Sequence, residues 1–127
     1  MKIFSATLAC RIQPKQRPRV FKGHGYTPKE TRNFEKLVSD WAKLTYKKKP
    51  SEKAIKVSIC MYFERAKSNK KKLHTQTPDI DNAAKGIMDA LNGIIWQDDK
   101  QIVEMSLEKH FADYVNPSFS IVVYELN

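Results

Sequence analysis

The chain has few cysteines and no long apolar run. Only two of its 127 residues are cysteine, Cys10 and Cys60, and neither belongs to a CxxC pair or a Cys/His grouping. The sequence therefore indicates neither a zinc site nor a disulfide framework, and both thiols are expected to be buried and reduced. The apolar N-terminus is interrupted at Arg11 and Pro14, which argues against a signal peptide and a membrane span. We expect a cytoplasmic protein without membrane contact.

Acidic residues are the minority charge. Lys and Arg number 23 against 14 Asp and Glu, so the formal net charge is +9 and the protein attracts anions at neutral pH. Nucleic acid is the leading partner class, while an anionic membrane and plain solubility are the alternatives that composition leaves open. The length suits one domain with one core, so we expect a single domain over residues 1–127.

Hydrophobic periodicity predicts the order β-α-β-α-β-β. Four segments have strand-compatible or alternating residues, namely 3–12, 55–63, 103–107 and 119–123. Two segments have apolar residues at helical spacing, 30–46 and about 79–92. The fold class expected from this order is α+β, with a single mixed sheet of about four strands and two helices covering a face. Residues 112–118 are expected to form a hairpin connection between the last two strands.

Two basic segments, residues 13–27 and 65–76, lack a clear period and are expected to be loops. We expect them to contact phosphates, so that binding to nucleic acid weakens steeply as salt rises. The predicted contact residues are Lys15, Arg17, Arg19, Lys22, Arg65, Lys67, Lys70, Lys71 and Lys72.

Several aspartates gather around the second predicted helix. Asp79 and Asp81 are close enough in sequence to contact one cation, and carboxylate oxygens are the ligands that Mg²⁺ prefers. Lys85 follows Asp81 by one helical turn, where it could orient a water or offset charge on a phosphate. Asp98 and Asp99 lie in a polar turn before the next strand, and a tertiary contact could bring one of them to the helix start. This pattern predicts metal-dependent chemistry on a phosphodiester.

Each of these features also has a simpler explanation. Asp79 and Asp81 suit the first turn of any helix, because the helix dipole favours acids there. Asp81 with Lys85 is compatible with an ordinary surface ion pair, and adjacent aspartates are common in turns. The histidines lie in different segments, so each is expected to be a loop or surface residue rather than a ligand: His24, His74 and His110.

The spacing of these residues resembles the signature of the RusA Holliday junction resolvases, small prophage-associated endonucleases. The matching motif is Asp79-x-Asp81-Asn82-x-x-Lys85-x-x-x-Asp89-Ala90-Leu91, followed by Trp96-x-Asp98-Asp99-x-Gln101. The chain departs from other members at residues 12–19 and at Thr77-Pro78, where some have an arginine. These departures concern junction selectivity and cleavage preference.

The resemblance implies a homodimer that binds four-way DNA junctions and makes paired incisions in DNA recombination and repair. It implies Mg²⁺ as the metal, with Mn²⁺ as a substitute, and no small-molecule cofactor. By position, Asp79, Asp81 and Asp99 correspond to the acidic metal-site residues, Lys85 to the catalytic lysine and Asp98 to a supporting ligand. The alternatives are a catalytically inactive junction-binding or DNA-binding module and a nuclease acting on other branched nucleic acids.

Overall fold

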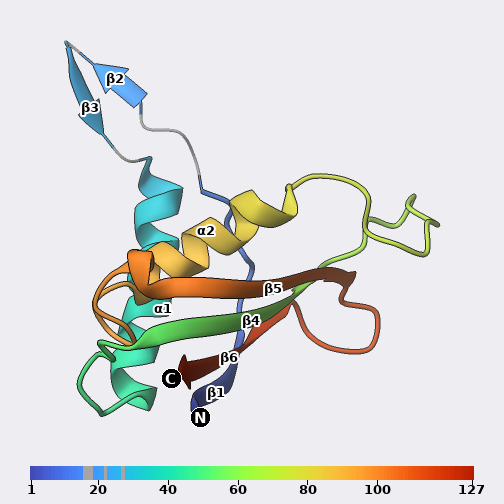
Figure 1. The fold of residues 1–127 in the computed structure, drawn as a ribbon. Helices are drawn as coiled ribbons and strands as arrows, with labels where there is room; N and C mark the ends of the chain where they lie inside the picture. The colour runs from blue at the N-terminus through green and yellow to red at the C-terminus, as the bar shows by residue number, and fades with distance from the viewer. Residues whose placement is uncertain (16–18, 22, 27) are drawn as a thin grey trace.

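The computed structural model describes residues 1–15, 19–21, 23–26 and 28–127 and contains two helices and a four-stranded mixed sheet (Figure 1). The elements are β1 (Lys2–Ala9), β2 (Arg19–Phe21), β3 (His24–Tyr26), α1 (Lys29–Thr45), β4 (Ala54–Phe63), α2 (Ile80–Leu91), a short 3₁₀ turn (Asp99–Gln101), β5 (Ile102–Phe111) and β6 (Ser118–Leu126). This confirms the predicted α+β class and the order of its main elements. No helix within the described ranges is both long enough and apolar enough to cross a membrane.

The order of strands in the sheet is β1-β6-β4-β5. Strand β4 pairs in parallel with β5 and antiparallel with β6, so β5 and β6 lie on opposite sides of it. The expected hairpin between the last two strands is therefore wrong: residues 112–117 instead cross the end of β4. The physical reason is that α2 connects β4 to β5, and a helical crossover of this kind joins parallel neighbours.

The first basic segment contains a small hairpin where a loop was expected. Strands β2 and β3 pair antiparallel, with Phe21 opposite His24, and Gly23 adopts a positive φ of 80° at the turn between them. Glycine suits this conformation because it has no Cβ. The hairpin projects away from the main sheet (Figure 1). Arg19 lies in β2, whereas Arg17 and Lys22 fall outside the described residues.

The core lies between the helices and one face of the sheet. Alternate residues of β4 point into it, and each is at most 1% exposed: Ile55, Val57, Ile59 and Met61. Helix α1 contributes Phe34, Val38 and Ala42, and α2 contributes Ala83, Ile87 and Leu91. Burying a Leu or Ile side chain contributes about 1.5–3 kcal/mol, so these contacts hold α2 against the sheet and set the position of both its ends.

The opposite face of the sheet, which we call the open face, is covered by neither helix. The intervening residues of β4 point to it and are only partly buried: Lys56, Ser58, Cys60 and Tyr62. Their partners on β5 are Glu104, Ser106, Glu108 and His110. The open face is therefore polar, as expected of a sheet with one solvated side.

Candidate active site at the start of helix α2

The aspartate pair lies exposed at the start of α2. Asp79 occupies the N-cap position, but its side chain makes no capping hydrogen bond, and Asp81 lies in the first turn. Within the described part of the chain, neither carboxylate has a hydrogen-bond or ion-pair partner. Helix capping would be the simplest explanation for an aspartate at this position, but Asp79 does not make the capping hydrogen bond.

An open hollow of about 310 Å³ adjoins this pair. It is lined by Pro14, Thr77, Pro78, Asp79 and Asn82. The backbone N–H of Lys15 donates to the Asn82 carbonyl at 3.2 Å, which attaches the first basic segment to the beginning of α2. Asp79 borders this hollow and Asp81 lies in the first turn of α2. Their carboxylates are oxygen donors of the kind that fits Mg²⁺, which takes ligands from one or two carboxylates and otherwise keeps water.

Two lysines, Lys85 and Lys15, contact Asp89 further along α2. Lys85 is exposed, and its Nζ lies 3.7 Å from Oδ1 of Asp89. Oδ2 of Asp89 is 3.1 Å from Nζ of Lys15, which also donates to Glu35 at 2.6 Å. Burial lowers the pKa of Lys15, but its hydrogen bonds to Glu35 and Asp89 outweigh this and raise it. Lys15, predicted to contact phosphate, therefore joins α1 to α2, whereas Lys85 remains accessible.

Asp98 and Asp99 lie beyond the other end of α2. Asp98 accepts a hydrogen bond from the Lys100 backbone N–H at 3.0 Å and caps the 3₁₀ turn, while Oδ1 of Asp99 accepts from Nε1 of Trp96 at 2.8 Å. A helix of 12 residues is about 18 Å long, so the expected contact with the start of α2 is not made within one chain. The reason is topological: the chain leaves α2 at its far end before entering β5.

Lys109 contacts the segment before Asp79, a role that the sequence analysis did not assign. Its Nζ donates to the carbonyl oxygens of Gln76 and Pro78, both at 2.8 Å. Lys109 lies near the end of β5, thirty-one residues from Pro78. The only signal in the sequence was that a lysine follows Val103, Met105 and Leu107 in an alternating apolar series.

Arg65 organises the second basic segment from within. Its guanidinium forms a bidentate pair with Asp113, at 2.9 Å from Nε to Oδ1 and 3.0 Å from Nη2 to Oδ2. Nη1 donates to the carbonyls of Asn69 and Lys71, and Cζ lies 3.8 Å from the centre of the Phe111 ring. Arg65, predicted to bind phosphate, thus uses its donors on the protein itself.

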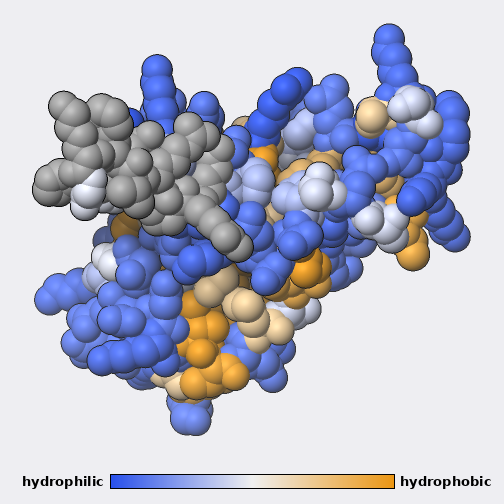
Figure 2. Space-filling model, turned by 90° about the horizontal axis from the view of Figure 1, so that it is seen from above, coloured by the Kyte–Doolittle hydropathy of each residue, from blue (hydrophilic) through white to orange (hydrophobic). Residues whose placement is uncertain are grey.

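The remaining lysines of this segment point into solvent. Lys67, Lys70, Lys71 and Lys72 are exposed, and none has an ion-pair partner among the described residues. Hydrophilic residues make up most of the coloured surface in Figure 2. The charges of these lysines are available to attract an anion such as a phosphate.

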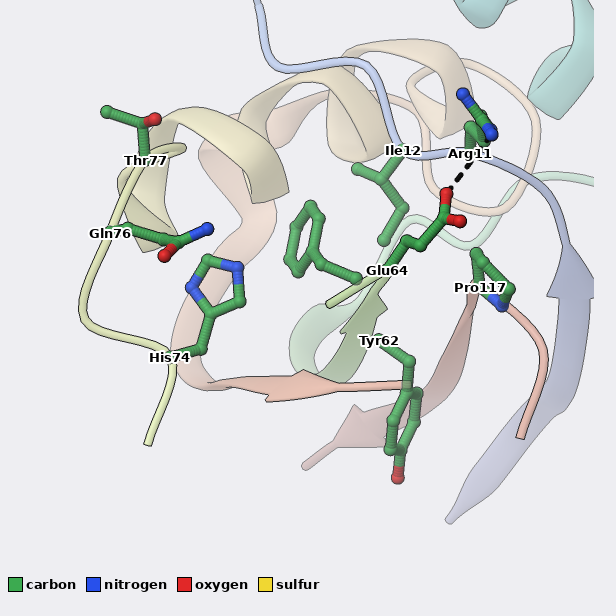
Figure 3. A pocket seen from close by; sticks show the side chains of 9 residues that line it. Arg11, Ile12, Tyr62, Glu64, His74, Gln76, Thr77 and Pro117 are labelled. Carbon is green, nitrogen blue, oxygen red and sulfur yellow. Dashed lines mark hydrogen bonds and ion pairs between the residues drawn. The ribbon is translucent and has the colours of Figure 1, made fainter. Parts of the chain in front are cut away.

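A second hollow, of about 220 Å³, lies beside the same loop (Figure 3). His74 lines it and is 7% exposed, with ring centres 5.0 Å from Phe63 and 4.7 Å from Phe111. Its Nδ1 is buried without a hydrogen-bond partner. Burial, assisted by the charge of Lys109, lowers the pKa of His74 and so favours its neutral form.

Comparison with known proteins identifies the family of this chain. A family model described as Endodeoxyribonuclease RusA matches residues 10–123, from the end of β1 into β6. The uncharacterized protein YqaN of Bacillus subtilis (strain 168) is 36% identical over 53 residues, which cover 42% of this chain and 36% of YqaN. The chain thus spans about a third of the length of this relative. The family model covers most of the 127 residues, so the chain belongs to the RusA endodeoxyribonuclease family.

Proposed function

We propose that this protein is a homodimeric, Mg²⁺-dependent endodeoxyribonuclease that resolves four-way DNA junctions by paired phosphodiester hydrolysis. Mn²⁺ is the expected substitute, and the expected processes are DNA recombination and repair. The observation that supports this function best is the pair Asp79 and Asp81 at the positive end of α2, whose carboxylates are exposed and have no partner among the residues that the structure describes. Carboxylates placed in this way are accessible to a divalent cation.

The residues around the pair have separate tasks. Asp79 and Asp81 would hold the ion, which when bound polarises the phosphoryl group and lowers the pKa of a coordinated water. Lys85, one turn after Asp81, supplies positive charge where negative charge develops on the phosphate. The exposed lysines 70–72 bind the DNA backbone and orient the junction.

Dimer formation gives Asp99 a place in this site. Strand β5 is an edge strand that begins next to Asp99 and ends beside Lys109, which contacts Pro78. Antiparallel pairing of β5 with the same strand of a second copy would bring the Asp99 end of one subunit to the Asp79 end of the other. Val103 and Met105 are 66% and 46% exposed on this strand and offer apolar area for such an interface. We therefore propose that Asp99 acts in the site of the partner, with Asp98 in support.

Mixing two inactive variants tests this proposal. Asp81→Asn and Asp99→Asn are each expected to bind a four-way junction but not to cut it, since the basic surface is unchanged. Unfolding the two together in urea and refolding them at equal concentration forms mixed dimers in which one site has both wild-type halves. Half of the dimers are mixed, and each mixed dimer has one such site out of two. About a quarter of all sites are then active, so the nicking rate should recover to about a quarter of the wild-type rate.

The controls are each variant refolded alone and a panel of flap, duplex and single-stranded DNA. If the mixture stays inactive while both variants still bind the junction, Asp81 and Asp99 do not share a site across subunits. Wild-type cutting by Asp99→Asn would remove Asp99 from the site altogether. Equal cutting of flaps and junctions would favour the alternative of a nuclease for other branched substrates.

A further inference from the structure

Three potential metal ligands meet on the open face of the sheet, away from α2. Cys60 lies on β4 and is paired in register with Glu108 of β5, and His110 follows two residues later on the same face. Sγ of Cys60 is 3.5 Å from Oε2 of Glu108, and Nε2 of His110 is 3.1 Å from Oε1 of the same carboxylate. The three ligand atoms all lie within 4.8 Å of one another. None of these residues has a role in the proposed cleavage.

The spacing suits a tetrahedral ion. Zinc bonds of about 2.0–2.3 Å at tetrahedral angles separate neighbouring ligand atoms by roughly 3.3–3.6 Å. Sγ of Cys60 and Nε2 of His110 contact different oxygens of Glu108, at 3.5 Å and 3.1 Å, so rotation of the carboxylate would bring one oxygen toward both. The three ligand atoms lie within 4.8 Å of one another on two strands held in register, and binding of the ion would shorten these separations.

A ring contact orients the imidazole of His110. Its ring stacks on Tyr62 of β4, with centres 5.4 Å apart and planes 24° from parallel. An ordinary ion pair would account for the contact between His110 and Glu108. The thiol of Cys60 donates to the other oxygen of the same carboxylate, so a sulfur, an oxygen and a nitrogen ligand are gathered at one position on the open face.

The donor set selects the kind of ion. A thiolate and an imidazole favour zinc and other borderline or soft transition metals, whereas Mg²⁺ and Ca²⁺ prefer oxygen ligands throughout. Three protein ligands also leave one tetrahedral position for water, as in zinc sites that remain open to a further ligand.

We propose that Cys60, Glu108 and His110 form a Zn²⁺ site with one water-accessible position, linking β4 to β5 on the open face. This site is separate from the Mg²⁺ site proposed at the start of α2 and does not depend on nuclease activity.

Cobalt binding to the full chain tests the site directly, because Co²⁺ takes the same tetrahedral geometry and reports a thiolate ligand by its charge-transfer absorption. We expect one Co²⁺ per chain with this absorption, displaced by an equivalent of Zn²⁺ and unaffected by a large excess of Mg²⁺. The absorption should vanish in Cys60→Ser, and the Co²⁺ affinity should fall at least tenfold in His110→Gln and in Glu108→Gln.

Cys10→Ser is the matched control, since it removes the other free cysteine and should leave the spectrum unchanged. Asp81→Asn should likewise bind Co²⁺ at the thiolate site as the wild type does. A wild-type protein without the thiolate absorption, or a spectrum that survives in Cys60→Ser, would overturn the proposal. Circular dichroism of each variant identifies any loss that arises from unfolding, and Zn²⁺ should raise the melting temperature of the wild type but not of Cys60→Ser.

Discussion

Replacing Lys109 with methionine tests whether a residue on β5 positions the candidate active site. The change keeps an unbranched side chain of similar length but removes the two hydrogen bonds from Nζ to the carbonyls of Gln76 and Pro78. These carbonyls belong to the three residues that precede Asp79. The substitution therefore loosens the entry to α2 without touching any carboxylate of the site.

The magnitude follows from the two contacts. Hydrogen bonds to a charged group contribute about 1.5–3 kcal/mol each, but the variant exposes the Gln76 and Pro78 carbonyls to water, which replaces part of this. We expect the free energy of unfolding to fall by about 2 kcal/mol, which lowers the urea midpoint by about 1 M for a small protein. Displacing a catalytic group by about 1 Å costs on the order of 100-fold in rate, so single-turnover cleavage should fall roughly 10- to 100-fold.

The assay compares single-turnover cleavage of a four-way junction with urea unfolding for Lys109→Met and for Lys48→Met. Lys48 is exposed, and its side chain has no partner among the described residues, so its variant controls for the lost charge. A third readout is the pKa of His74 by NMR. Burial lowers this pKa most and the charge of Lys109 adds to the effect, so it should rise in Lys109→Met only.

Unchanged cleavage in Lys109→Met alongside reduced stability would refute the positioning role and leave Lys109 a purely structural residue. Unchanged stability and an unchanged His74 pKa would show that the contacts themselves are absent in solution.

Two further predictions concern the loop beside this site. Arg65→Lys keeps the charge but cannot reproduce the bidentate pair with Asp113 or the stacking on Phe111, so trypsin should cut residues 65–76 faster and junction binding should weaken severalfold. Asp113→Asn should speed proteolysis in the same way. Equal rates of proteolysis in the wild type and both variants would contradict the role of Arg65 in holding this loop. The second prediction concerns pH. Because burial and Lys109 lower the pKa of His74 in the folded protein, the imidazole of the unfolded chain is protonated at a higher pH than that of the folded chain. The stability contributed by His74 is therefore present above its ordinary pKa of 6.5 and is lost as pH falls through the folded value. The urea midpoint should therefore fall more between about pH 7.5 and pH 5.5 in the wild type than in His74→Phe, and parallel pH profiles would argue against a buried neutral ring.

Local patterns predicted the helices and strands well. Helix α1 was expected at residues 30–46 and spans Lys29–Thr45, and α2 was expected at about 79–92 and spans Ile80–Leu91. Amphipathic spacing predicts both helices because one face of each is buried against the sheet along its whole length. The apolar residues of that face are three or four positions apart in the sequence. The aspartates at the start of α2 were found for the same reason, since their positions depend only on the helix that carries them.

Pairing between distant segments was not predictable from these patterns. The sequence alone left open which strand lies beside β4, because alternation marks a strand but not its neighbour. The same limit applies to single residues: Lys109 meets Pro78 only because β5 ends beneath the beginning of α2.

By itself, the sequence determined the α+β class, the boundaries of its helices and the aspartate and lysine motif that marks the family. Tertiary structure decided which residues lie close together within one subunit. It separates Asp99 from Asp79 by the length of α2 and brings Cys60 to Glu108 and His110 across two strands. The physical reason is that helix spacing depends on residues three or four positions apart, whereas a site depends on strand order and register, which the packing of the whole chain sets.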